Sequence, residues 1–275
     1  MKQPNHHGTH YMLFPNLDFF KQYVDNLSND GVEYKLNSFG LRCDEFSNNH
    51  DGLHILFAGC SETLGEGSTI DDSWSYMLYN KILKSSRCSG FFSLGIGGGS
   101  WIDIFSLIMQ YIDKYGCPDY IFINLPNLGR YLQYIDENNY NVEQNGVYRY
   151  ALNHKDIVDH TKYIKTIGTT NFNLIEQDYI YFSLYIRLFE NFCKEKNIRL
   201  FWGTWSEDLI EQIDRGFVNY KNFIKIHPNN NQLAELCLSN KNLSLEKPDG
   251  HYGTAYHTYW SNIFYEKYKG EIHVK

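Results

Sequence analysis

The chain has 275 residues, of which 43% are hydrophobic and 17% aromatic, and its formal net charge is −7. This composition supplies enough buriable surface for a packed core and excludes a disordered chain. An acidic chain with scattered Lys and Arg lacks the basic surface that phosphate binding requires, so we expect no nucleic-acid partner. No apolar run reaches the ~20 residues of a membrane-spanning helix, and the N-terminus lacks the apolar segment of a signal peptide. We therefore expect a cytoplasmic protein without a membrane partner.

The six cysteines are spread singly, with no CxxC pair and no Cys/His cluster at zinc spacing. This pattern predicts reduced, mostly buried thiols. Three histidines near the start, His6, His7 and His10, come without a carboxylate cluster. We therefore expect neither a metal site nor a cofactor.

Apolar runs alternate with segments of helical spacing along most of the chain, which predicts repeated strand–helix units. In chain order, these elements are a helix over 17–27, a strand over 53–58, a helix over 73–83, a strand over 91–94, a helix over 102–115, a strand over 120–125, a helix over 176–196, a strand over 199–204 and a helix over 254–268.

Such alternation is typical of a parallel sheet covered by helices on both faces, that is, a three-layer α/β/α sandwich. We expect one domain over 51–275 with a polar insertion around 131–170, preceded by an N-terminal extension over 1–50 that packs on the core. Ligands of such sheets bind outside the carboxyl ends of the strands. The candidate loops therefore follow Ala58, Leu94, Leu125 and Thr204.

The loop after the first strand contains Ser61. A hydroxyl on the turn between a strand and a helix projects above the sheet, and the N–H groups of that turn point toward the group it attacks. Ser61 is therefore a candidate nucleophile. The alternative is that Ser61 caps the following helix.

A serine nucleophile needs a base and a carboxylate that orients the base. Asp249 and His251 lie close enough in sequence to supply both from one loop, although a surface Asp-Gly turn beside a solvated histidine is the alternative. His257 is a competing base. We expect it about one turn into the final helix, where packing or support of the site suits it better.

Two further residues could bind an oxyanion. Gly98 lies in the glycine run 95–99, where a residue without a side chain leaves its N–H open to a substrate. Asn127 follows the third strand and carries an amide that can donate to the same oxyanion. The alternative for the glycine run is a tight loop; it lacks the GxGxxG spacing and the lysine of nucleotide-binding loops.

These blocks, in this order, resemble the SGNH or GDSL-type hydrolase superfamily. They are a strand, Gly-x-Ser-x-Thr-x-Gly, a helix with an early Trp, a glycine-ended strand, a strand that ends near Asn, and an Asp/His loop. The segment NSFGLR over 37–42 resembles the lead-in of one branch, so the resemblance covers about 37–268. It implies a flavodoxin-like fold and a carboxylic ester hydrolase.

By position, the resemblance implies Ser61 as nucleophile and first oxyanion donor, and Gly98 and Asn127 as the other donors. It implies His251 as general base and Asp249 as its orienting acid.

Three positions depart from the family pattern. Cys60 stands where the family usually has Asp, and a Cys60 thiol is a less favoured nucleophile. The asparagine block reads LPNL, which keeps Asn124 as an alternative to Asn127. The spacing Asp-x-His replaces Asp-x-x-His, so either Asp249 still reaches His251 or the histidine works with a backbone carbonyl.

The expected function is hydrolysis of a small-molecule or carbohydrate ester through an acyl-enzyme. The polar stretch 131–170 favours a carbohydrate O-acetyl ester, because it could cover a polar ligand. An O-acyltransferase would use the same residues. A third alternative is a non-catalytic carbohydrate-binding or structural protein that retains the fold. The sequence does not specify the oligomeric state.

Overall fold

The computed structural model describes residues 32–128, 131–134, 149–152, 174–215, 220, 222–240, 243–247 and 251–272. The helix expected over 17–27 and most of the insertion expected around 131–170 lie outside these residues. The described elements are, in order, β1 (Ile55–Gly59), α3 (Ser61–Leu64), η2 (Ile70–Asp72), α4 (Trp74–Leu83), β2 (Phe92–Gly95), α5 (Trp101–Tyr115), β3 (Tyr120–Leu125), β4 (Tyr131–Tyr134), β5 (Arg149–Leu152), α8 (Leu174–Glu195), β6 (Arg199–Thr204), α9 (Glu207–Arg215), β7 (Phe223–Ile224), α10 (Asn230–Ser239) and α11 (Thr254–Ile272).

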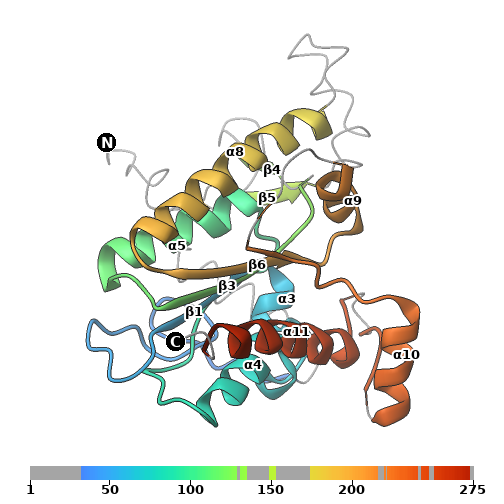
Figure 1. The fold of residues 1–275 in the computed structure, drawn as a ribbon, viewed down its shortest axis with the longest axis horizontal. Coiled ribbons are helices and arrows are strands. Elements are labelled where there is room, and N and C mark those ends of the chain that lie inside the picture. The colour runs from blue at the N-terminus through green and yellow to red at the C-terminus, as the bar shows by residue number, and fades with distance from the viewer. Residues whose placement is uncertain are drawn as a thin grey trace, which may run out of the picture.

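Five strands form one parallel sheet with the order β2-β1-β3-β6-β7 (Figure 1). This is the flavodoxin-like order, in which the chain reverses direction across the sheet between β1 and β3. The predicted parallel sheet is therefore confirmed. Loops that follow β1 and β3 flank the point where such folds bind their ligands.

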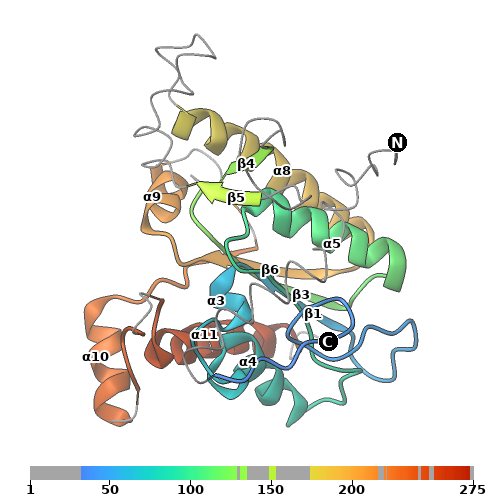
Figure 2. The same ribbon diagram turned by 180° about the vertical axis from the view of Figure 1, so that it is seen from behind.

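Helices cover both faces of the sheet, so the predicted three-layer sandwich is also confirmed (Figures 1 and 2). Along β3, Ile121 and Ile123 pack in the core on the side of α5 and α8. Tyr120 and Phe122 pack in a second core with residues of α4 and α11. All of β3 is buried, because a central strand has a hydrophobic layer on each side.

All six cysteines are free thiols, as the sequence predicts. The expectation that most of them are buried is wrong: only Cys60 and Cys193 are buried, and Cys117 is exposed. Cys117 follows α5 in the loop that leads to β3, outside both elements.

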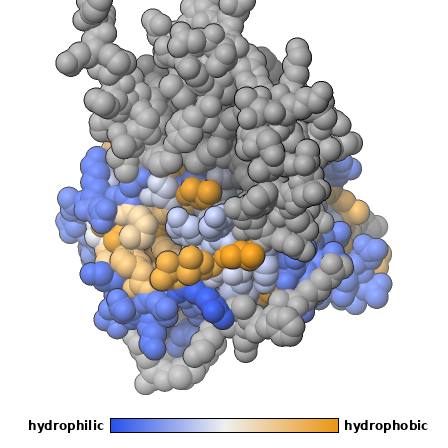
Figure 3. Space-filling view, turned by 90° about the horizontal axis from the view of Figure 1, so that it is seen from above, coloured by the Kyte–Doolittle hydropathy of each residue, from blue (hydrophilic) through white to orange (hydrophobic). Residues whose placement is uncertain are grey.

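One side of α8 exposes large apolar side chains. Ile180, Leu184 and Leu188 recur four residues apart and are 65%, 54% and 56% exposed. Figure 3 views the molecule from above relative to Figure 1, and on that face hydrophobic residues gather among hydrophilic ones.

Among the described residues, no helix combines the length and the apolar character that crossing a membrane requires.

A buried histidine precedes β1 at the end of the sheet opposite the candidate loops. The His54 ring stacks on His50 with 3.6 Å between the ring centroids, and its Nε2 lies 2.8 Å from the Tyr111 hydroxyl. Burial, with a contribution from His50, lowers the pKa of His54 from 6.5 to about 3. The folded chain therefore keeps His54 neutral where the unfolded chain already binds a proton.

Stability is therefore expected to fall as the pH drops from about 6.5 toward 3, by up to about 1.4 kcal/mol per pH unit from this group. His54→Gln keeps a polar partner for Tyr111 but does not titrate. Its melting temperature, followed by circular dichroism from pH 7 to pH 4, should fall less steeply than that of the wild type. Parallel curves for the two proteins would contradict the assignment.

Candidate functional site

Ser61 lies directly after β1 as the first residue of α3. The N-cap position belongs to Cys60, whose side chain makes no capping hydrogen bond. The interpretation of Ser61 as a helix cap is therefore wrong. The hydroxyl is left on the turn between strand and helix, at the carboxyl edge of the sheet.

The serine loop, residues 59–68, is fixed by its own backbone. Gly65 ends α3 in a left-handed conformation with φ of 73°, which brings the chain back toward Ser61. The amides of Gly65 and Glu66 donate to the Ser61 carbonyl at 3.0 and 3.1 Å. Gly95 at the end of β2 lets α3 approach closely, because a Cβ there would lie 2.4 Å from the Leu64 nitrogen.

Residues upstream of β1 also hold the serine loop. The Asn37 side chain accepts hydrogen bonds from the amides of Phe39 and Leu41, which shapes the turn before Arg42. The Arg42 guanidinium then donates to the carbonyl oxygens of Gly65 and Ser68, at 2.9 Å each. The segment that resembles the family lead-in therefore packs beneath the serine loop.

His251 lies on the second arm of a hairpin that precedes α11. The amide of Lys247 donates to the His251 carbonyl at 2.9 Å, and the amide of Gly253 donates to the Leu245 carbonyl at 2.9 Å. Residues 248–250, which include Asp249, lie outside the described residues. The orienting role of Asp249 therefore stays a prediction.

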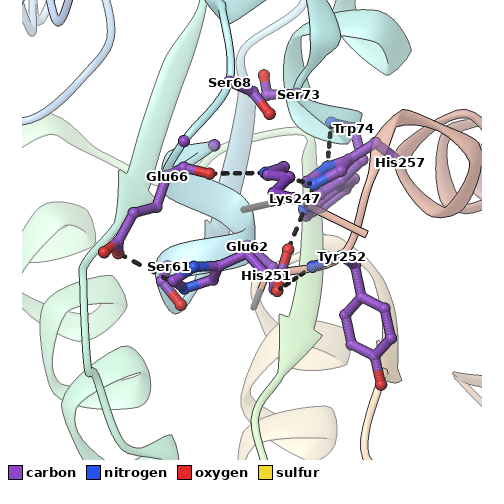
Figure 4. Close-up of polar contacts among 12 residues, drawn as sticks. Ser61, Glu62, Glu66, Ser68, Ser73, Trp74, Lys247, His251, Tyr252 and His257 are labelled. Carbon is purple, nitrogen blue, oxygen red and sulfur yellow. Dashed lines mark hydrogen bonds and ion pairs between the residues drawn. The ribbon is translucent and has the colours of Figure 1, made fainter. Parts of the chain in front are cut away.

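Glu62 connects this hairpin to the serine loop (Figure 4). Its buried carboxylate accepts a hydrogen bond from the Tyr252 amide at 3.2 Å. Its other oxygen lies 3.3 Å from His257 Nε2. The residue after the candidate nucleophile is thus joined to the residue after the predicted base.

Burial tends to raise the pKa of Glu62, but the contact with His257 and the charges of Lys247 and His251 lower it overall. Glu62 is therefore ionised. The Lys247 ammonium beside it is also buried and donates to the Glu66 carbonyl at 2.6 Å. The buried charges of Glu62 and Lys247 thus balance each other in this part of the site.

His257 lies in the first turn of α11, as expected, and it is fully buried. Its Nδ1 accepts a hydrogen bond from the Trp74 amide at 3.1 Å. The ring proton of neutral His257 must therefore sit on Nε2, which faces Glu62. Burial lowers the pKa of His257, so the ring stays neutral. Because Nδ1 holds a backbone amide and Nε2 holds a carboxylate, His257 is not available as a base.

Ser61 and the His251 ring overlap in the view of Figure 4. The Ser61 Oγ atom lies 4.0 Å from the Cys60 Sγ atom, and within the described part of the chain it forms no hydrogen bond with His251. Catalytic hydrogen bonds are often long before a substrate binds. His251 Nε2 lies 3.8 Å from a carboxylate oxygen of Glu66.

The predicted oxyanion donors lie in the loops after β2 and β3. Gly98 is exposed and has a φ of 66°. Asn127 is half-buried in the loop, whereas Asn124 lies within β3 and is fully buried. Asn127 and Asn124 both stay candidates for the third oxyanion donor. Gly98 and Asn127 lie at the expected edge of the sheet, and their roles as donors stay predictions.

Aromatic side chains border the serine loop. Trp205 follows β6, and its indole N–H donates to Cys60 Sγ at 3.3 Å. The Trp205 and Tyr252 rings meet edge to face with 5.9 Å between their centroids. Both side chains are half-buried, so part of each can face a ligand.

No group of His, Cys, Asp and Glu able to hold a metal ion occurs among the residues that the structure describes.

Neither a protein-family model nor a curated protein matches the sequence. The chain is similar to a solved structure from Desulfitobacterium hafniense DCB-2, assigned as a lipolytic protein of the G-D-S-L family. The two are 12% identical, the match covers 76% of this chain and 98% of that chain, and the TM-score is 0.39. This distant similarity transfers no residue role to the chain.

Sequence reasoning missed Glu62, Glu66 and Lys247. Their contacts join segments about 190 residues apart, and no local spacing reveals such pairs. Only the structure shows that Glu62 lies in a buried four-residue helix, where an acidic residue needs a partner.

Proposed function

We propose that the chain is a serine ester hydrolase with Ser61 as its nucleophile. The observation that carries this proposal is the Glu62 carboxylate, which fixes the Tyr252 amide at 3.2 Å and so holds the His251 hairpin against the serine loop. A hydroxyl on a strand–helix turn and an imidazole on a segment joined to that turn are the two groups that acyl transfer requires.

In the proposed mechanism, His251 accepts the Ser61 proton as Oγ bonds to the acyl carbon. The amide N–H groups of Ser61 and Gly98 and the side-chain amide of Asn127 stabilise the oxyanion, and each such donor typically contributes about 10²- to 10³-fold in rate. Protonated His251 returns the proton to the leaving alcohol. Water then attacks the acyl-enzyme with His251 again as base.

The proposed substrate is a carbohydrate O-acetyl ester. Trp205 and Tyr252 support this choice, because they place aromatic surface beside the serine loop where a sugar ring can pack. The polar insertion that first suggested a carbohydrate lies mostly outside the described residues. An acyltransferase would share every residue named above and differ in the acceptor, so adding free sugar to an ester assay separates acyl transfer from hydrolysis.

Labelling with a fluorophosphonate probe, measured by intact mass, tests the proposal. The wild type is expected to gain one adduct, and Ser61→Ala and His251→Ala are expected to lose it while keeping the circular dichroism spectrum of the wild type. Ser68→Ala, which removes a buried hydroxyl from the same loop, is the matched control and should label normally.

Two results would count against this function. An absent adduct on folded wild-type protein would indicate a binding or structural protein. An adduct that survives Ser61→Ala but disappears in Cys60→Ala would make the neighbouring thiol the nucleophile.

A further inference from the structure

We propose that Glu66 is the carboxylate that positions His251, a role that rests on the proposed hydrolase function. The predicted orienting acid, Asp249, belongs to the hairpin itself. Glu66 comes instead from the serine loop, on the other side of the site.

Glu66 makes three contacts that hold the two halves of the site together. Its amide donates to the Ser61 carbonyl at 3.1 Å. Its carbonyl accepts from the Lys247 ammonium at 2.6 Å, on the first arm of the hairpin. Its carboxylate lies 3.8 Å from Nε2 of His251, on the second arm. One residue thus contacts the nucleophile, the hairpin and the base.

The surroundings strengthen the interaction between the carboxylate and the ring. The Glu66 side chain is 8% exposed and the His251 side chain 23% exposed, so water screens the pair only in part. At 3.8 Å the contact is electrostatic rather than a hydrogen bond. A negative charge at Nε2 favours a proton on that nitrogen, and it stabilises the imidazolium that forms during the reaction.

The proton on Nε2 decides which nitrogen acts as the base. Neutral imidazole carries one ring proton, so a proton held on Nε2 leaves Nδ1 to accept the hydroxyl proton of Ser61. An acid that oriented the ring from Nδ1, as expected of Asp249, would produce the opposite tautomer. The two carboxylates therefore predict different states of the same ring.

Nitrogen NMR of wild-type protein labelled with ¹⁵N-histidine distinguishes these states. The His251 signals are those lost in His251→Gln. We expect neutral His251 to carry its proton on Nε2. A proton on Nδ1 would overturn the proposal. This measurement needs neither a variant of Glu66 nor a reactive serine, so its outcome is independent of whether the fluorophosphonate labels the protein.

The labelling rate supplies a second test. Glu66→Gln is expected to label at least about tenfold more slowly than the wild type, because the His251 ring loses the carboxylate that orients it. Glu66→Asp keeps the charge and should restore much of the rate. The matched control is Glu246→Gln, which removes an exposed charge from the same hairpin. A Glu66→Gln labelling rate equal to that of the control, with the loss found in Asp249→Asn instead, would overturn the proposal.

Discussion

Replacing Glu62 with leucine is expected to lower the free energy of unfolding by about 3–5 kcal/mol, the usual cost of leaving a buried charge without its counter-charge. The substitution leaves Lys247 and the His257 Nε2–H buried without their carboxylate, and it removes the acceptor of the Tyr252 amide. Urea unfolding followed by fluorescence at pH 7 measures the loss.

Three comparisons make this result specific to the buried charges. Glu235→Leu changes an exposed residue of α10 and should alter stability by less than about 0.5 kcal/mol. The double variant Glu62→Leu, Lys247→Met should lose less than the sum of the two single variants, because it leaves no uncompensated charge. The wild-type stability that depends on Glu62 should also disappear as the pH falls through the lowered pKa of its carboxyl group. Additive losses would show that the two charges are not coupled.

Gly95→Ala should be the second strongly disruptive substitution, with a loss of about 3 kcal/mol. The added Cβ would lie 2.4 Å from the Leu64 nitrogen and 2.7 Å from the Thr63 carbonyl carbon. Both neighbours are backbone atoms of α3, so no side-chain rotation can make room. The helix that carries Ser61 must move, and we expect fluorophosphonate labelling to fall together with stability.

Gly270→Ala is the matched control for this prediction. A Cβ at Gly270 would meet nothing within 4 Å. Because Gly270 lies in α11, alanine there should raise stability by about 0.5–1 kcal/mol. A Gly95→Ala protein with wild-type stability and labelling would show that α3 does not rest on β2 as described.

The sheet could be predicted because its central strands are buried on both faces. The strands 120–125 and 199–204 match β3 and β6 residue for residue, since a run of apolar residues suffices where both sides need them. Other elements were missed for different reasons. The two-residue strand β7 has no pattern to detect, whereas α10 buries only Leu233 among its side chains and so lacks an apolar face. Its capping box at Asn229 and Gln232 was a usable signal.

The candidate site was only partly predictable. The place of Ser61 follows from strand order, because the edge of a parallel sheet where ligands bind is fixed by the fold. The arrangement around it follows from tertiary contacts. Glu62 and His257 are unremarkable in their own segments, and only the packing of α11 beside α4 brings the histidine to the Trp74 amide and the carboxylate.

The hydrogen bonds of Arg42 also define the smallest unit that can contain a working site. The carbonyl groups that close the serine loop depend on a guanidinium that lies thirteen residues before the first strand begins at Ile55. A chain shortened to start at that strand would keep the whole sheet but lose the cation that those carbonyls bind. The segment that supports the candidate site therefore begins upstream of Arg42, well before the boundary of the sheet.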